Sequence, residues 1–184
     1  MERLGCTGMR VFFGIEPDQA TALAISDWRD RQFGRAGRPV PVANLHMTLA
    51  FAGELSVAAI DGLCEAVESW LGSTSLPGTV LALDTTGYWP GPGIYWLGPG
   101  SWPDSLEAQA RKLRQLVVGA GARRDRRTFQ PHITLFRQCS EAPPLPARMP
   151  AAVLDYREIA LYESRPLRDG VAYHVLQAWP LPGA

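Results

Sequence analysis

The same four-residue pattern occurs twice in the chain, each time after a similar order of expected elements. Residues 46–49 (HMTL) and 132–135 (HITL) both read histidine, apolar residue, threonine, leucine. In each case an expected strand and helix precede the pattern, so the chain divides into related halves of about 9–87 and 93–179. A repeated strand–helix–strand unit predicts an α+β fold with two pseudo-symmetric lobes, helices outside mixed or antiparallel strands, and an active-site groove between the lobes.

The expected elements come from apolar periodicity and from turn residues. Strands are predicted at 9–15, 45–51, 80–86, 94–97, 132–136, 159–162 and 172–178. Helices are predicted from Pro17 to Gly34, from an N-cap at Ser56 to Gly72, and over 102–118. The Gly- and Pro-containing segments 35–42, 88–93, 119–130 and 142–150 are expected to be loops. None has linker character, so residues 1–184 are expected to form a single domain.

Composition excludes several classes of protein. Hydrophobic residues make up 46% and charged residues 20%, which suits a globular core rather than a disordered chain. The 18 basic and 18 acidic residues balance, so any attraction for nucleic acid must come from a local cluster.

The cysteines and apolar segments bear on location. No stretch approaches the ~18 apolar residues that cross a bilayer, and the first ten residues lack a signal-peptide run. Cys6, Cys64 and Cys139 have no C-x-x-C spacing. We therefore expect a reducing, cytoplasmic location without a membrane partner, and a monomer as the simplest of the open oligomeric states.

The repeated pattern suits chemistry at a phosphate. Residues two apart in a strand share a face, so each pattern presents one imidazole and one hydroxyl together while its apolar residues face the core. If the strands lie opposite each other, two hydroxyls can donate to a bound phosphate. One neutral histidine can take a proton from water while the other, as imidazolium, protonates the leaving oxygen. Unperturbed pKa values near 6.5 would allow both states near neutral pH.

Metal binding is the competing use of these histidines. His46 and His132 have no Asp, Glu or Cys nearby at ligand spacing, which makes a poor metal set. His174 is the remaining histidine, and as an isolated residue in an expected strand it is interpreted as structural. We therefore expect no metal and no cofactor.

The repeated pattern, together with MRVFFGI at 9–15, NLHMTLAFAGEL and FQPHITLFR, resembles the two-histidine (2H) phosphoesterase superfamily. The resemblance is greatest to the RNA 2',3'-cyclic phosphodiesterases, also called 2'-5' RNA ligases, and covers about 9–179. It implies a metal-independent hydrolase that opens a 2',3'-cyclic phosphate at an RNA 3' end to a 2'-phosphate. It further implies His46 as proton donor, His132 as proton acceptor, and Thr48 and Thr134 as phosphate ligands.

Arg137 matches an arginine that often follows the second pattern in this branch, which implies a clamp on a phosphate oxygen. On a straight strand, however, a residue five after His132 would face away from the groove. The assignment therefore requires a bulge or a strand end near Phe136.

Other side chains are candidates for contact with RNA. Four arginines precede the second pattern within five residues: Arg123, Arg124, Arg126 and Arg127. Such a cluster can attract an RNA backbone, although many such runs are solvated loops.

Aromatic residues near the expected strand ends offer a further possibility. Trp89, Tyr95 and Trp96 could stack on a terminal base, but packing in the core or in a turn is the favoured interpretation of each. Phe12 and Phe13 are adjacent in a strand, so one is expected to face the core and the other the groove, and the sequence does not tell which.

Three functions therefore remain open. The first is hydrolysis of RNA 2',3'-cyclic phosphate ends, with RNA ligation by the same groups as an added capacity. The second keeps the chemistry but acts on a small cyclic phosphate or nucleotide. The third is a noncatalytic module that binds RNA ends, which would not need two proton-transfer groups.

Overall fold

The computed structural model describes residues 8–181, so Cys6 lies outside the described part. The strands are β1 (Met9–Ile15), β2 (Arg38–Pro39), β3 (Met47–Leu55), β4 (Thr79–Ala82), β5 (Thr85–Trp89), β6 (Ile94–Gly98), β7 (Ile133–Arg137), β8 (Val153–Tyr156), β9 (Glu158–Leu167) and β10 (Gly170–Pro180). The helices are α1 (Gln19–Phe33), α2 (Val57–Ser73) and α3 (Asp104–Gly119), with a short 3-10 helix, η1, at Val42–Asn44. None of the helices in this described part is long and apolar enough to cross a membrane.

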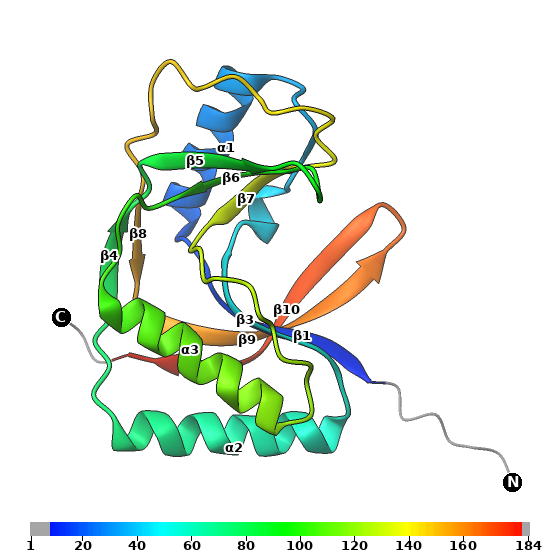
Figure 1. Ribbon diagram of the computed structural model, residues 1–184, viewed down its shortest axis with the longest axis vertical. Coiled ribbons are helices and arrows are strands. Elements are labelled where there is room, and N and C mark those ends of the chain that lie inside the picture. The colour runs from blue at the N-terminus through cyan, green and yellow to red at the C-terminus, as the bar shows by residue number, and fades with distance from the viewer. Residues whose placement is uncertain (1–7, 182–184) are drawn as a thin grey trace, which may run out of the picture.

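An eight-stranded antiparallel sheet runs through the molecule in the order β10-β9-β1-β3-β7-β6-β5, with β2 also paired to β7 (Figure 1). Among the described residues, β3 and β7 are joined through the single pair Met47 and Ile133. The sheet therefore divides at this pair. One part, β1, β3, β9 and β10 with α2 and α3, is called the α2–α3 lobe, and the other, β2, β5, β6 and β7 with α1, is called the α1 lobe.

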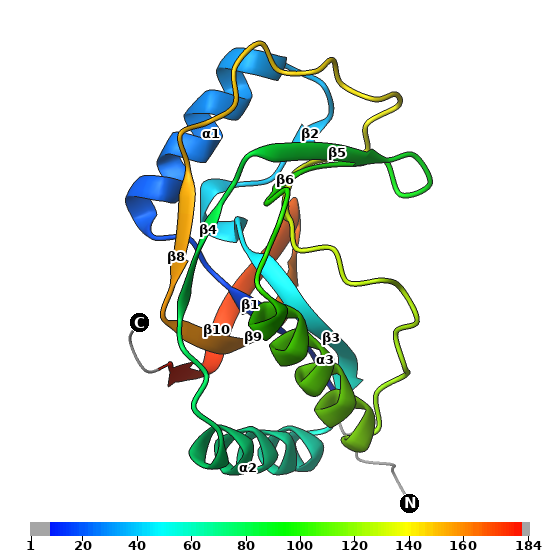
Figure 2. The same cartoon turned by 60° about the vertical axis from the view of Figure 1, so that its left-hand side comes forward.

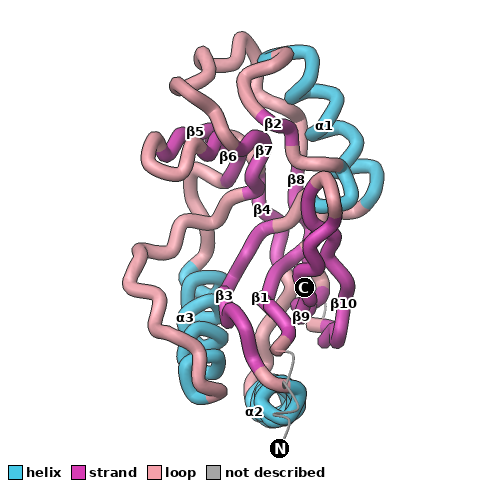
Figure 3. Tube along the Cα trace, turned by 90° about the vertical axis from the view of Figure 1, so that its right-hand side faces the viewer, coloured by secondary structure: helices cyan, strands magenta, loops and turns pink. Residues whose placement is uncertain are grey.

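Figure 3 shows these two groups of strands one above the other, and Figure 2 shows β4 and β8 along one side of both. The α+β, two-lobed architecture predicted from the repeated pattern is confirmed.

The lobes exchange helices between the two halves of the sequence. Helix α1 follows β1 in the chain, yet its Phe33 ring lies 5.0 Å from Tyr95 of β6 and 6.3 Å from Phe136 of β7. Helix α3 follows β6, yet it packs on β3. Strand β9 from the second half pairs with β1. The spatial lobes therefore differ from the halves 9–87 and 93–179, because a sequence repeat gives the order of elements but not the surface that each helix covers.

Local capping signals set the helix starts. The Asp18 carboxylate accepts from the Thr21 N–H at 2.8 Å, so α1 begins after Asp18 rather than at Pro17. The Ser56 hydroxyl oxygen accepts from the Ala59 N–H at 3.2 Å, as expected for the predicted N-cap of α2. Helix α1 ends at Gly34, whose φ of 56° belongs to the left-handed region.

The strands differ from their prediction in three places. The predicted strand 80–86 is two strands, because β4 pairs with β8 while β5 joins the main sheet. Strand β8 itself was not expected after the Pro-rich segment. The hairpin β9–β10 is longer than the predicted 159–162 and 172–178. Apolar runs predict an extended chain, but they do not identify its partner strand.

Candidate active site

The two repeated patterns meet where β3 joins β7. Met47 and Ile133 pair in antiparallel register and are both fully buried. This register places each histidine opposite the threonine of the other pattern. Because side chains alternate along an extended chain, His46, Thr48, His132 and Thr134 project from the face opposite Met47 and Ile133. The four residues therefore share one face with approximate twofold symmetry about this pair, and they make up the candidate site.

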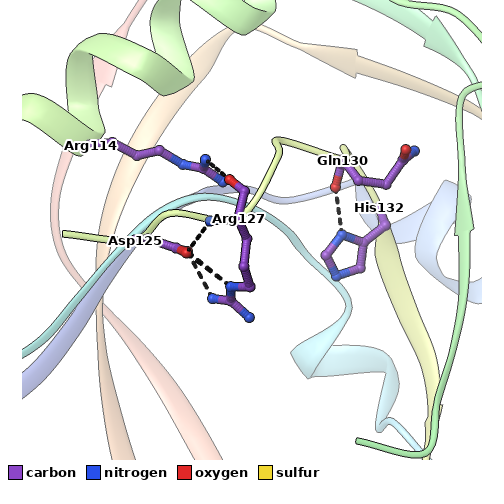
Figure 4. Close-up of polar contacts among 5 residues, drawn as sticks. All are labelled: Arg114, Asp125, Arg127, Gln130 and His132. Atoms are coloured by element: carbon purple, nitrogen blue, oxygen red, sulfur yellow. Dashed lines mark hydrogen bonds and ion pairs between the residues drawn. The ribbon is translucent and has the colours of Figure 1, made fainter. Parts of the chain in front are cut away.

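Both histidines are oriented by the same backbone contact. The Nδ1 of His46 lies 2.8 Å from the carbonyl oxygen of Asn44. The Nδ1 of His132 lies 2.7 Å from the carbonyl oxygen of Gln130, as Figure 4 shows. A carbonyl can only accept, so each Nδ1 carries a proton and each Nε2 is the basic nitrogen of the neutral ring. Asn44 and Gln130 were not predicted as site residues, because the contact uses the backbone carbonyl, which the sequence does not distinguish.

His46 is packed among aromatic rings from three strands. Its ring centroid lies 4.8 Å from that of Phe12 on β1 and 4.8 Å from that of Tyr173 on β10, the latter edge to face. Phe12 in turn stacks on Tyr162 of β9 at 5.1 Å. Phe12 is therefore the groove-side member of the adjacent pair, while Phe13 belongs to the main core. Tyr162 and Tyr173 were missed because nothing in the sequence indicates that β9 and β10 return to β1.

His132 has its own aromatic neighbours on the α1 lobe. The Trp89 ring lies 4.6 Å from it, edge to face, and the buried Trp96 ring lies 6.1 Å away. Tyr95 is buried against Phe33 instead. Of the three aromatic residues considered for base stacking, Tyr95 and Trp96 are thus packing residues, and Trp89 is a half-exposed wall of the site.

Burial dominates the electrostatics of both histidines. It lowers the pKa of His46 to about 4, helped by the positive charge of Arg137 and by His132, against the opposing effect of the hydrogen bond to Asn44. The pKa of His132 is lowered for the same reasons, burial first and then Arg137 and Arg127. The expectation of unperturbed pKa values near 6.5 is therefore wrong for these buried rings, and both imidazoles are neutral at neutral pH.

Strand β7 contains the irregularity that the assignment of Arg137 to the phosphate requires. The register between β6 and β7 shifts so that Leu135 is an extra residue between Thr134 and Phe136. Leu135 and Phe136 are consequently both buried, and the alternation resumes with Arg137 exposed. Its positive charge lowers the pKa of both histidines.

The arginine-rich segment lies beside the groove but is partly neutralised. Arg127 forms an ion pair with Asp125 at 2.8 Å, and its backbone carbonyl accepts a hydrogen bond from Arg114 (Figure 4). Arg123, Arg124 and Arg127 line a hollow of about 470 Å³ together with other residues of this segment and with 51–54 of β3. Arg126 is exposed outside this hollow.

The described residues contain no group of three or more His, Cys, Asp or Glu side chains suited to a metal ion. His174 follows Tyr173 in β10, so it projects from the opposite face of the strand, where it is exposed.

A two-lobed α+β fold with paired histidines and threonines at the lobe junction defines a phosphoesterase of the two-histidine type. The chain belongs to the 2'-5' RNA ligase superfamily, whose sequence profile matches residues 17–164. The resemblance inferred from the repeated pattern is thereby confirmed.

Individual relatives match nearly the whole chain. The RNA 2',3'-cyclic phosphodiesterase of Escherichia coli (strain K12) is 37% identical over 175 residues, covering 94% of this chain and 96% of the relative. The protein of the same name from Thermus thermophilus is 30% identical over 188 residues, covering 95% and 91%. The crystal structure of E. coli LigT complexed with 3'-AMP superposes with a TM-score of 0.85 at 35% identity, covering 95% of this chain and 98% of that one.

Proposed function

We propose that this protein is an RNA 2',3'-cyclic phosphodiesterase, which hydrolyses the cyclic phosphate at an RNA 3' end to a 2'-phosphate. The observation that carries this proposal is the projection of two imidazoles and two hydroxyls from one face around the Met47–Ile133 pair. Relatives covering nearly the whole chain bear the same name. All four groups come from one chain, so a monomer is a sufficient catalytic unit.

The proposed roles follow from the in-line geometry of phosphoryl transfer. His132 accepts a proton from the attacking water, since its Nε2 has no hydrogen-bond partner among the described residues. His46 donates a proton to the departing 3'-oxygen on the opposite side of the phosphorus. Thr48, Thr134 and Arg137 hold the other phosphate oxygens through hydrogen bonds and charge.

Protonation of His46 and phosphate binding support each other in this scheme. The Nε2 of neutral His46 lies 3.1 Å from the Thr48 hydroxyl, so the hydroxyl donates to it. When Nε2 gains a proton it becomes a donor, and the Thr48 hydroxyl is released to bond a phosphate oxygen. The phosphate anion also raises the pKa of the imidazole it faces. Binding of the substrate thus favours the protonated form of His46, which is the acid that the reaction needs.

The exposed arginines of the segment before His132 supply attraction for the RNA chain. We assign this role to Arg123, Arg124 and Arg126, with Arg127 contributing less because Asp125 neutralises it. A chain of zero formal net charge has no stronger general field, so this local cluster dominates. Raising the salt concentration is expected to weaken RNA binding, and Arg123→Ala with Arg124→Ala is expected to reduce that salt dependence.

A cytoplasmic location is part of the proposal. It is supported by Cys64 and Cys139, which are both free thiols in the structure.

Ligation of RNA would use the same groups in the same roles. An RNA 5'-hydroxyl in place of water would give a 2'-5' linkage, with His132 taking the proton from the hydroxyl. Water at ~55 M makes hydrolysis the default unless the second RNA end is held at a large effective molarity.

The test uses an oligoribonucleotide ending in a 2',3'-cyclic phosphate, with the product identified by its resistance to a 3'-specific phosphatase. We expect a 2'-phosphate product and full activity in EDTA. Replacing His46 or His132 by Ala should lower turnover about 10²- to 10⁴-fold each. Unchanged turnover in either variant would contradict the two-histidine mechanism.

The same assay separates the alternatives. Cyclic mononucleotides and ADP-ribose cyclic phosphate are compared with the oligonucleotide at equal concentration. A higher kcat/KM on the small molecules would assign the enzyme to them instead of RNA ends. Binding of the cyclic end without turnover of any substrate would indicate a noncatalytic module.

A further inference from the structure

Two arginines lie directly opposite each other at the outer end of β7. Arg38 of β2 and Arg137 of β7 are cross-strand partners, so their side chains share a face of the sheet. Like charges in this position repel each other and destabilise the pairing. Within residues 8–181 neither guanidinium has a carboxylate within ion-pair distance. Among the described residues, the pair is therefore a local positive charge without an ion-pair partner.

These two arginines line a pocket that adjoins the catalytic groups. The pocket has a volume of about 370 Å³ and lies between β2, the end of β7 and the tip of the β9–β10 hairpin. Its wall includes Asn44 and Tyr173 as well as Arg38 and Arg137. Asn44 holds His46 through its carbonyl, and Tyr173 packs against the His46 ring. The pocket is thus the continuation of the phosphate site toward the hairpin.

The hairpin tip keeps Arg38 at this wall. The Arg38 guanidinium donates to the backbone carbonyl of Asp169 at 3.4 Å. Gly170 follows, with a φ of 155°, and a Cβ at this position would lie 2.9 Å from Arg38 Nη2, so a side chain would displace the guanidinium. The Asn44 side chain donates to the Val171 carbonyl at 2.7 Å and fixes the tip itself.

We propose that this pocket binds a second phosphate group, the phosphodiester on the 5' side of the terminal nucleotide, with Arg38 as its specific ligand. The inference rests on the proposed function, since Arg137 then holds the reacting phosphate and Arg38 the next one along the chain. The enzyme recognises the end of a polynucleotide rather than an isolated nucleoside cyclic phosphate. Asp169 lines the same pocket and limits its affinity for anions.

The experiment measures binding and needs no turnover, so it is independent of whether hydrolysis is observed. Adenosine 2'-monophosphate and adenosine 2',5'-bisphosphate share the product phosphate and differ only at the 5' position. Isothermal calorimetry on the wild-type chain should show about tenfold tighter binding of the bisphosphate. In Arg38→Ala the dissociation constant of the monophosphate divided by that of the bisphosphate should fall close to one.

Two further variants sharpen the result. Arg35→Ala removes the same charge from an exposed position shortly before β2 and outside the pocket, and it should keep the wild-type ratio. Asp169→Asn removes the negative charge from the pocket and should increase the ratio.

Equal wild-type affinity for both ligands, or a preference for the bisphosphate that survives in Arg38→Ala, overturns the proposal. If Arg38→Ala weakens both ligands equally, Arg38 holds the reacting phosphate together with Arg137, and there is no second subsite. Absence of hydrolysis in the oligonucleotide assay, with the bisphosphate preference intact, would reject the proposed function and leave the second site in place.

Discussion

The imidazole of His46 makes folding depend on pH. Its pKa is lowered from 6.5 to about 4, chiefly by burial. Between these values the unfolded chain binds a proton that the folded chain does not, so the free energy of unfolding increases as pH rises from 4 to 6.5. The stability present above pH 6.5 is lost as pH falls toward 4. The contribution of this residue is at most about 3 kcal/mol.

Urea unfolding at pH 4.5 and pH 7.5 measures this dependence. In His46→Asn the difference in unfolding free energy between the two pH values should shrink by up to about 3 kcal/mol. His174→Asn is the matched control, because His174 is exposed on β10, and it should keep the wild-type difference. An identical pH dependence in wild type and His46→Asn would contradict burial as the cause of the lowered pKa.

At the residue scale, the sequence predicts the part of the site that is repeated. His46 and His132, each with a threonine two positions later, are visible because a strand puts alternate residues on one face. Arg137 could be named only with a condition, since a bulge at Leu135 decides its direction. Phe12 and Tyr173 reach His46 from other strands, and local spacing carries no information about those contacts.

At the scale of elements, the two strands that carry the patterns share an irregularity. In β3 the register with β1 shifts at Leu49, as the register of β7 with β6 shifts at Leu135. Phe51 and Arg137 therefore occupy equivalent positions on the two sides of the site, one aromatic and one cationic. The two strands are therefore similar in geometry, but the side chains at these equivalent positions differ. One end of the groove has an aromatic ring and the other a positive charge.

Asn44 connects two elements, η1 and the β9–β10 hairpin, next to His46. Its side chain donates to the Val171 carbonyl at 2.7 Å while its own carbonyl orients His46. Asn44→Ala should lower the unfolding free energy by about 1 kcal/mol and speed hydrogen exchange at the hairpin tip. We also expect a lower kcat, because the segment that holds the His46 ring loses its anchor.

Gln130 precedes His132 by two residues, as Asn44 precedes His46, and it provides the control. The Gln130 side chain makes only a 3.5 Å contact to the carbonyl of Pro131, so Gln130→Ala should change the unfolding free energy by less than about 0.5 kcal/mol. Equal loss of stability and equal hairpin exchange in both variants would show that the Asn44 side chain anchors nothing.

At the scale of the whole molecule, the sequence repeat predicts two lobes but not the exchange of helices between them. The guanidinium of Arg29 on helix α1 is buried against the Phe136 ring of β7 and donates to the Val40 carbonyl. Both partners follow the helix in the sequence and lie in the α1 lobe. Helix α3 covers β3 in the same way from the other half. Which surface each helix covers depends on contacts between residues about 100 positions apart, as for Phe33 with Phe136. Periodicity along the chain does not encode such pairings.

This exchange predicts that the two lobes unfold together. Phe33→Ala removes the ring contacts with Tyr95 and Phe136, which should cost about 2 kcal/mol and lower the Tm by about 5 °C. Calorimetry should still show one transition, and amides in β1 and in β6 should lose protection by the same amount because both lobes depend on α1 and α3. Leu23→Ala on the exposed face of α1 should shift stability by less than about 0.5 kcal/mol. If amides in β6 lost protection while those in β1 kept theirs, the lobes would be independent folding units, and the interleaved packing would contribute no cooperativity.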